Sequence, residues 1–374
     1  MCQQARCGLA RPDLPSVLHS TYATHTCILI HHGCAAQAIF RMQSGVCQFF
    51  RGFLRSQGFT EIHTPKLVAT SSEGGADVFK VEYFGGAAYM AQSPQLYKQM
   101  ALMADLDRVF EIGPVFRAEN SFTHRHMTEF TGLDLEMTFR EHYHEVLDVL
   151  DRTFNAVFDG LNQSYAEELE AVRAQFPFEN LRYRYPCLRF TYPEAMALLR
   201  AEGPAHLRAL QETTTDEAER LRLKKREQDV ATHGDLDDIG TEDEKLLGEI
   251  VGKIHGQDFY IIDKFPAHVR PFYTMPDPNN ADFANAYDIF IRGEEVTSGA
   301  QRIHDSAMLL ERAAARDPPV DLSPIAAYVD SFKYGAFPHA GGGVGLERVV
   351  MLFCGLPNIR KTSLFPRDPK RLTP

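Results

Sequence analysis

Residues 108–119 read Arg-Val-Phe-Glu-Ile-Gly-Pro-Val-Phe-Arg-Ala-Glu, and residues 128–139 read Thr-Glu-Phe-Thr-Gly-Leu-Asp-Leu-Glu-Met-Thr-Phe. In both stretches apolar side chains alternate with polar or small ones, which is the period of a β-strand with one buried face. As antiparallel neighbours the strands would present a polar floor made by Glu111, Gly113, Arg117, Glu119, Gly132, Asp134 and Glu136. Alternating charges more often mark the solvated outer face of an antiparallel sheet. The pattern therefore predicts the strands and leaves the role of their polar face open.

The sequence around these strands predicts an α+β fold, an antiparallel β-sheet flanked by helices. Apolar residues recur at three- and four-residue steps over 39–54, which indicates an amphipathic helix that ends at Gly58. A strand over 59–67 follows, and Pro65 restricts it to a sheet edge or a boundary. The last third of the chain is expected to hold four strands and a helix, over residues 258–263, 287–291, 295–303, 340–345 and 346–354. The second and third of these strands read as a hairpin around Arg292-Gly293.

The composition describes an ordinary soluble protein. The 374 residues are 44% hydrophobic and 24% charged, values that exclude a collagen, a coiled coil, a largely disordered chain and a disulfide scaffold. Lysine and arginine number 39 against 50 acidic residues, so the net charge is 39 − 50 = −11, which argues at first sight against a nucleic-acid partner. No apolar stretch approaches the roughly 20 residues of a membrane span. Three widely spaced cysteines beyond residue 36 fit a reducing compartment, so we expect a cytoplasmic location and no membrane contact.

The chain divides into a short first segment and one large domain. Residues 1–36 are rich in cysteine and histidine and are expected to form a poorly ordered segment. Cys27, His31, His32 and Cys34 match no paired zinc-ligand spacing, so a metal site there is disfavoured. Residues 37–374 are expected to form the catalytic domain. Near 205–245 it carries a charged insertion whose alternating signs are typical of a solvated helix face.

Four glycines in five positions mark the segment 341–345. A strand without side chains lets a flat ligand lie against its backbone, and Arg348 on the following helix would stand beside that ligand. The segment is neither a P-loop nor a dinucleotide fingerprint, since the spacing of both motifs is missing. A tight turn is the bland alternative for such a glycine run.

A carboxylate, a hydroxyl and an arginine follow one another at Glu295, Ser298 and Arg302. This set suits a divalent cation bridging phosphates beside an anionic group, although an exposed hairpin is the plain alternative. Strict alternation puts Glu295 and Ser298 on opposite faces, so we expect a β-bulge at Ser298-Gly299. A glycine-bearing loop at 71–76 and a helix that begins near Pro94, with Lys98 in its first turns, complete the candidate elements.

Together these elements resemble the class II aminoacyl-tRNA synthetases, and within them the aspartyl-tRNA synthetases of the eukaryotic cytosolic and archaeal type. The three class motifs resemble residues 59–65, 115–130 and 341–348 of this sequence. The subfamily signatures resemble residues 72–76, 92–98, 270–273, 298–302 and 365–368. The resemblance covers roughly residues 37–374. Such synthetases also carry an N-terminal anticodon-binding domain, and we expect it to be absent here, because residues 1–36 are too short and unlike it.

The resemblance implies a set of catalytic and binding residues. It makes Arg117, Glu295 and Arg348 catalytic, with Glu295 and Ser298 holding Mg²⁺. It assigns the amino acid to Glu73, Gln95, Lys98, Arg117, Asp134, Ser298 and Arg302. It assigns ATP to Arg117, Glu119, Arg125, His126, Met127, Glu295, Gly345 and Arg348. The implied reaction is ATP-dependent activation of L-aspartate to aspartyl-adenylate, followed by transfer to the 3′ end of tRNA(Asp).

The resemblance also implies partners, and it leaves rival functions. A homodimer is expected through the helix and strand around Pro65, and the acceptor end of the tRNA near Arg125 and His126. The basic residues of the C-terminal tail are further candidates for tRNA contact. One alternative is an ammonia-dependent asparagine synthetase-like paralogue that uses the same adenylate. A catalytically inactive paralogue is another, and the presence of the arginines and of Glu295 argues against it.

Overall fold

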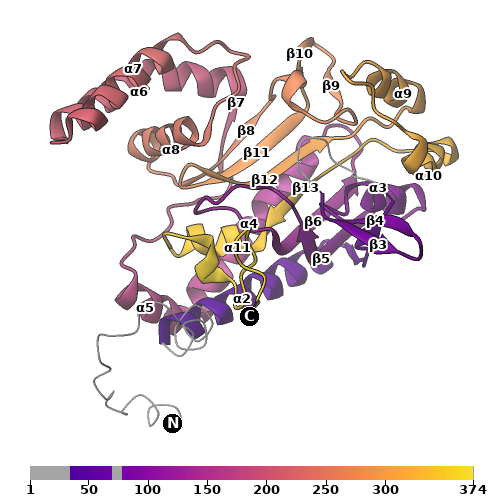
Figure 1. The fold of residues 1–374 in the computed structure, drawn as a ribbon, viewed down its shortest axis with the longest axis horizontal. Helices are drawn as coiled ribbons and strands as arrows, with labels where there is room; N and C mark the ends of the chain where they lie inside the picture. Colours follow the sequence, from indigo (N-terminus) through magenta and orange to yellow (C-terminus); the bar gives the residue numbers. More distant parts are fainter. Residues whose placement is uncertain (1–33, 70–77, 374) are drawn as a thin grey trace, which may run out of the picture.

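A computed structural model describes residues 34–69 and 78–373, and its centre is one eight-stranded sheet (Figure 1). In spatial order the strands are β1 (Thr60–Glu61), β5 (Arg108–Phe116), β6 (Glu129–Thr138), β13 (His339–Gly345), β12 (Glu294–Gln301), β11 (Ala286–Ile291), β8 (Phe259–Asp263) and β7 (Leu188–Thr191). The two outermost pairs are parallel and the inner pairs are antiparallel. The predicted α+β fold is thus confirmed.

Helices and two small sheets surround these strands. The α-helices are α2 (Cys34–Ser56), α3 (Gln95–Met103), α4 (His144–Ser164), α5 (Ala166–Gln175), α6 (Tyr192–Thr213), α7 (Glu217–Thr232), α8 (Thr241–His255), α9 (Ser306–Ala314), α10 (Ala326–Ser331) and α11 (Leu346–Phe353). The 3₁₀ helices are η2 (Ala267–Val269), η3 (Ser323–Ile325), η4 (Phe332–Tyr334) and η5 (Ile359–Thr362). The small sheets are β2 (Leu67–Val68), β4 (Gly86–Met90) and β3 (Lys80–Tyr83), and β9 (Pro276–Asp277) with β10 (Asn280–Ala284).

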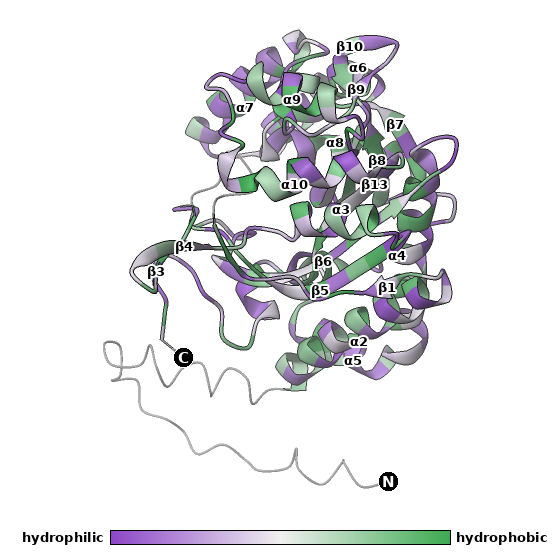
Figure 2. Cartoon of the chain, turned by 90° about the vertical axis from the view of Figure 1, so that its right-hand side faces the viewer, coloured by the Kyte–Doolittle hydropathy of each residue, from purple (hydrophilic) through white to green (hydrophobic). Residues whose placement is uncertain are grey.

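One face of the sheet is covered by α2, α4 and α11, which share the largest hydrophobic core with its strands (Figure 1). The apolar positions of α2 fall on one side, as the sequence periodicity predicted, and Figure 2 shows hydrophobic and hydrophilic residues mixed along this helix. Because this face is filled by apolar side chains, the ligand-binding chemistry has to lie on the other face.

The opposite face is only partly covered. In β8, Phe259 and Ile261 join the first core, whereas Tyr260 and Ile262 pack in a second core with α6 and α8. A strand buried on both faces is mainly apolar, as β8 is from Phe259 to Ile262. A third core beside α3 and α10 covers the other side. Between these two helical groups, the glycine-rich β13 and its neighbours β6 and β12 are left to line a pocket.

The strand predicted over 59–67 is two short strands, β1 and β2, with Pro65 between them, and β1 is a sheet edge as expected. The hairpin at Arg292-Gly293 is confirmed, with φ of 52° and 76° at the two turn residues. The predicted bulge exists but its position was wrong. Ile289 pairs with Thr297 and Phe290 with Glu295, so the extra residue is Val296 and not Ser298-Gly299.

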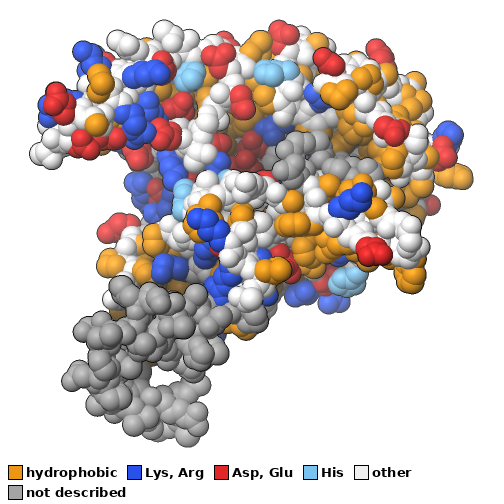
Figure 3. Space-filling model, viewed as in Figure 1, with side chains coloured by type: hydrophobic (Ala, Val, Ile, Leu, Met, Phe, Trp, Pro, Cys, Tyr) orange, Lys and Arg blue, Asp and Glu red, His pale blue; other side chains and the backbone are white. Residues whose placement is uncertain are grey.

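The charged segment near 205–245 forms the end of α6, the whole of α7 and the start of α8. Figure 3 shows acidic and basic side chains interspersed over this lobe. The α7 helix buries only Leu223 and Val230, against α6, which agrees with a mainly solvated helix. At the other end of the chain, Cys34 to Ala36 belong to α2, so the boundary drawn at residue 36 was slightly late. Cys27, His31 and His32 lie outside the described residues.

Within the described residues, no helix is both long and apolar enough to cross a membrane.

Candidate active site

The pocket is a cavity of about 320 Å³ lined by three strands, whose glycines Gly132, Gly299, Gly343 and Gly345 leave part of its floor without side chains. Gly343 and Gly345 of β13 lie beside Gly132 and Asp134 of β6, in register across the two strands. At the neighbouring position Gly341, a Cβ atom would stand 2.2 Å from the carbonyl oxygen of Leu135, so only glycine fits there. The glycine run is therefore a strand that accepts close neighbours and leaves a flat surface for a ligand.

One end of the pocket is closed by a buried arginine. Arg302, 4% exposed, directs Nε to Glu136 Oε1 at 2.8 Å and Nη2 to Glu136 Oε2 at 3.2 Å. Its Nη2 also donates to Gln95 Oε1 at 3.1 Å and to the carbonyl oxygen of Gly341 at 2.9 Å. Within the described residues, Arg302 Nη1 makes no hydrogen bond and Gln95 Nε2 is buried without an acceptor. Two nitrogen donors at this end, Arg302 Nη1 and Gln95 Nε2, are thus available to an anionic group.

Lys98 lies next to the pocket residue Asp134 but does not itself line the pocket. Its Nζ is 3.1 Å from Asp134 Oδ1 and 3.2 Å from Glu136 Oε2, and the side chain is 2% exposed. Burial alone would raise the pKa of Glu136, but the adjacent Arg302 guanidinium and Lys98 ammonium lower it below its ordinary value. Glu136 therefore remains ionised and holds both cations in place beside the closed end of the pocket, on the same face of β6 as Asp134.

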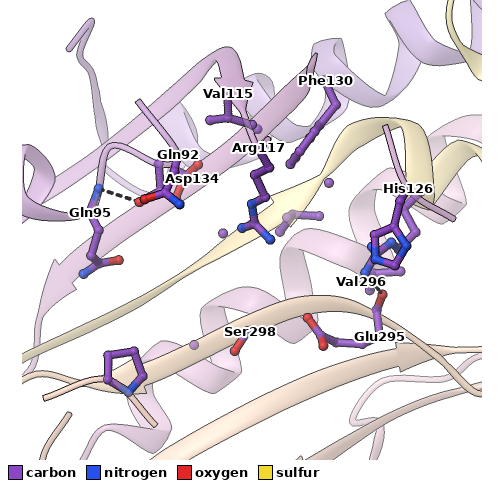
Figure 4. Close-up of a pocket in the computed structure, with 18 of the residues that line it drawn as sticks. Gln92, Gln95, Val115, Arg117, His126, Phe130, Asp134, Glu295, Val296 and Ser298 are labelled. Carbon is purple, nitrogen blue, oxygen red and sulfur yellow. Dashed lines mark hydrogen bonds between the residues drawn. The ribbon is translucent and has the colours of Figure 1, made fainter. Parts of the chain in front are cut away.

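The other end of the pocket is lined by the loop after β5 and by the start of α11. Figure 4 shows Arg117 reaching from the floor toward Glu295 and Ser298. Arg348 donates to the carbonyl oxygen of Glu295 at 2.9 Å and to that of Arg125 at 3.3 Å. This end therefore carries several cations within one pocket, an arrangement that suits a polyphosphate.

His126 stands among these arginines. Burial, followed by the charges of Arg348, Arg125 and Arg117, lowers the pKa of His126 to about 4. The imidazole is therefore neutral near pH 7, and the arginines alone supply the positive charge of this wall.

Glu295 and Ser298 both face the pocket. Strict alternation would put them on opposite faces of β12, so a bulge between them is needed, as the sequence analysis argued. The extra residue Val296 brings two positions three apart onto one face of β12. Ser298 Oγ accepts a hydrogen bond of 2.8 Å from Arg270, which also pairs with Asp288 at 2.7 Å. Burial and the nearby charge of Glu295, opposed by Arg270, raise the pKa of Asp288 to about 6.

The structure brings the predicted site residues together in most cases. The pocket is lined by Gln95, Arg117, Glu119, Arg125, His126, Met127, Asp134, Glu295, Ser298, Arg302, Gly345 and Arg348. Lys98 is excluded from the wall, and Glu73 lies outside the described residues. Their roles stay predictions. The sequence analysis placed Glu136 on the polar face by its period of two and Arg270 in a subfamily signature, but it assigned neither residue a role, because their partners lie elsewhere along the chain.

The pocket combines a glycine-containing floor with a buried arginine at one end and several arginines at the other. The family described as tRNA synthetases class II (D, K and N) matches residues 22–369. The chain belongs to this family, as its three motifs predicted.

Individual relatives indicate which type of synthetase within the family the chain resembles. The chain is 55% identical over 340 residues to "Aspartate--tRNA ligase, cytoplasmic 1" of Dictyostelium discoideum, covering 91% of this chain and 54% of the relative. It is 53% identical over 339 residues to "Aspartate--tRNA ligase, cytoplasmic" of Homo sapiens, covering 91% of this chain and 62% of the relative. The resemblance to the aspartyl type is thereby confirmed. The chain spans less than two thirds of the length of these relatives.

Solved structures agree on the fold. A putative aspartyl-tRNA synthetase from Leishmania major matches with a TM-score of 0.82 and 45% identity, over 97% of this chain and 71% of that one. An asparaginyl-tRNA synthetase from Pyrococcus horikoshii, complexed with asparaginyl-adenylate, matches with a TM-score of 0.77 and 29% identity, over 93% and 72%. One fold is thus shared by relatives named for two different amino acids, so the fold alone does not identify the amino acid.

Proposed function

We propose that this chain activates L-aspartate with ATP and transfers it to tRNA(Asp). The α-carboxylate oxygen of aspartate attacks the α-phosphorus of ATP, pyrophosphate leaves, and aspartyl-adenylate forms. The 3′ hydroxyl of the terminal adenosine of the tRNA then attacks the carbonyl carbon, and AMP leaves. The observation that carries the proposal is the pair of available donors at the closed end, Arg302 Nη1 and Gln95 Nε2.

These donors favour aspartate over asparagine. A side-chain carboxylate accepts from both donors and brings a negative charge to Arg302, whereas an amide group directs its own N–H atoms toward one of them. Buried groups left without a partner make such discrimination worth several kcal/mol, by the order of magnitude known for buried polar sites. Asp134 would hold the ammonium group, and Glu73 is proposed as its second partner.

The end of the pocket opposite Arg302, called the ATP end below, would neutralise the negative charge of the phosphates during adenylate formation. A carboxylate and a triphosphate repel each other, so the reaction needs cations and an in-line arrangement more than it needs a side-chain nucleophile. Arg117 would bind the α-phosphate and the attacking carboxylate. Arg348 would stack on adenine and reach the γ-phosphate, using the planarity of its guanidinium group. Glu119, His126 and Met127 line the same wall.

The carboxylate of Glu295 and the hydroxyl of Ser298 are oxygen ligands of the kind that would hold Mg²⁺. Within the described residues there is no group of three acidic, histidine or cysteine ligands for a metal, so protein ligands alone would not complete the coordination. Mg²⁺ commonly takes one or two carboxylates and completes its octahedron with phosphates and water. When bound, the ion would supply positive charge between the phosphates.

Support for the tRNA and dimer proposals comes from surface features. The basic tail lies beside the loop after β5, since Thr128 donates to the carbonyl oxygen of Arg367 at 2.9 Å. Phe122 in that loop lies 4.3 Å from Arg360 and 4.6 Å from Lys370, measured to its ring centroid. A homodimer through α2 and the strand around Pro65 is consistent with β1 being an edge strand. The names of the relatives support a cytoplasmic location.

A substrate panel tests the proposed function. ATP–pyrophosphate exchange is measured with aspartate, asparagine and lysine, and aspartyl transfer is then measured with tRNA(Asp) and with ammonia as acceptors. We expect exchange with aspartate alone and transfer to tRNA that weakens steeply with salt. Exchange with asparagine, formation of free asparagine, or no exchange at all would each contradict the proposal.

A further inference from the structure

The loop after β5, which lines the proposed ATP end, is fastened to α8, whose first turn belongs to the charged insertion. Arg125 of the loop directs Nη1 to Glu244 Oε2 at 3.3 Å and Nη2 to Thr241 Oγ1 at 2.5 Å. Both partners belong to the first turns of α8. An arginine side chain has many rotamers in solution, and two hydrogen bonds from one rigid fork restrict it to a few.

A second contact repeats this connection one residue away. His124 Nε2 lies 3.1 Å from Glu294 Oε2, and Lys245 Nζ lies 3.2 Å from Glu294 Oε1. Lys245 belongs to α8 and Glu294 to β12, so the loop, the helix and the strand meet at one carboxylate. Since Glu294 precedes the pocket residue Glu295, this contact reaches the wall of the pocket.

The α8 helix can hold the loop because it is itself fixed to the sheet. A Cβ atom on Gly248 would stand 2.3 Å from the Cα atom of Gly293, so the helix touches the turn of the β11–β12 hairpin backbone to backbone. On the solvent side, Arg226 of α7 pairs with Asp243 at 2.7 Å and Arg222 with Glu242 at 2.7 Å. The charges of α7 therefore brace the first turn of α8, where the sequence alone indicated only a solvated face.

We propose that Thr241 and Glu244 of α8 are positioning residues for ATP, which act by holding Arg125 at the wall of the pocket. This inference rests on the proposed function and deepens it, because it assigns the insertion a part in nucleotide binding. The contacts of Arg125 with α8 would hold the loop in place for ATP. Arg348 donates to the carbonyl oxygen of Arg125, so the position of the Arg348 side chain also depends on the position of this loop. A loop held before ATP arrives avoids the entropic cost of ordering it on binding.

The test compares single variants in the full chain. ATP dissociation constants with Mg²⁺ are measured by calorimetry for Thr241→Val, Thr241→Ser, Glu244→Ala and the wild type. We expect a rise of about tenfold for Thr241→Val and Glu244→Ala, the size of one lost hydrogen bond to a charged group, and recovery in Thr241→Ser. Glu249→Ala is the matched control, because Glu249 lies on the same helix and pairs with His206 at 2.8 Å, away from the loop.

A double-mutant cycle separates positioning from a general structural role. Glu244→Ala is introduced into an Arg125→Ala chain, where it should raise the ATP dissociation constant no further. In pyrophosphate exchange the single variants should raise KM for ATP and leave KM for aspartate unchanged. An unchanged dissociation constant in Glu244→Ala and Thr241→Val, or full additivity in the cycle, overturns the inference.

The outcome is independent of the identity of the amino acid. A wild-type chain that binds ATP but exchanges nothing with aspartate contradicts the proposed function, and the ATP measurements still decide the positioning role. A wild-type chain that binds no ATP overturns both.

Discussion

The two ends of the pocket are built in different ways. At the closed end Arg302, Glu136 and Lys98 are almost completely buried, and their partners come from strands and from α3. At the opposite end, the proposed ATP end, the arginines belong to a loop and to the start of a helix, and the side chain of Arg117 is 40% exposed. Strands and buried pairs give a precise site for a small substrate, whereas loops admit a large one. We therefore expect changes at the closed end to cost more than changes at the ATP end.

The largest effect is expected from Arg302→Leu. The variant removes the buried guanidinium and leaves a carboxylate of aspartate without its partner, so aspartate-dependent exchange should fall at least about a thousandfold. ATP binding, measured by calorimetry, should stay within about twofold because the other end is intact. Retained exchange in a folded Arg302→Leu chain would remove the basis for the assignment of aspartate.

Glu136→Gln tests whether the closed end depends on its buried ion pairs. Breaking such a pair leaves Arg302 and Lys98 with one carboxylate fewer, and the free energy of unfolding should fall by about 3 to 5 kcal/mol. Because the pKa of Glu136 is lowered by folding, its contribution is present above the ordinary value of 4.5 and is lost as pH falls. Urea unfolding of the wild type and the variant at pH 7 and pH 4 checks both statements. If the free energies of unfolding of the two chains differed equally at both pH values, the ion-pair account would be contradicted.

Glu347 is the contrasting buried acid, at the ATP end. Its carboxylate accepts from the backbone N–H of Thr131 at 3.0 Å instead of facing two cations. Burial, opposed by this hydrogen bond, raises the pKa of Glu347 to about 7. A raised pKa means stability that is complete below the ordinary value of 4.5 and is lost as pH rises through 7.

Glu347→Gln should remove the loss of stability that the wild type shows as pH rises, because glutamine does not ionise. Relative to the wild type, the variant should gain stability between pH 4.5 and 7, by up to about 3 kcal/mol on the scale of 1.36 kcal/mol per pKa unit. Urea unfolding of both chains across this range measures the difference. A difference that does not change with pH would show that Glu347 does not titrate there.

Arg348→Lys probes the ATP end directly. Lysine keeps the charge but cannot donate to the carbonyl oxygens of both Glu295 and Arg125, and it lacks the planar group that would stack on adenine. We expect KM for ATP in pyrophosphate exchange to rise about tenfold, with KM for aspartate unchanged. An equal rise for both substrates would mean that the two ends are not separable.

The same contrast explains how far the sequence predicts the molecule. Strand periods and turn residues are local, so β5, β6, the β11–β12 hairpin and the β13–α11 unit were predicted correctly. The alternation of polar residues in β12 predicted a bulge, but it did not fix the residue, and the bulge is at Val296 instead of Ser298-Gly299. Pairing across the fold leaves no local signal. Arg125 and Glu244 are 119 positions apart, so their contact could not be read from either segment.

The smallest effect is expected from Arg222→Gln on α7, the far end of the support for the ATP loop. Its ion pair with Glu242 is exposed, with the two side chains 49% and 58% accessible, and exposed pairs contribute at most about 1 kcal/mol. We expect a small loss of stability and a change in ATP affinity below about twofold, both vanishing in high salt. If the ATP dissociation constant instead rose as much as in Glu244→Ala, α7 would hold the loop as firmly as α8 does. The open end of the pocket would then depend on the whole insertion and not on one turn of helix.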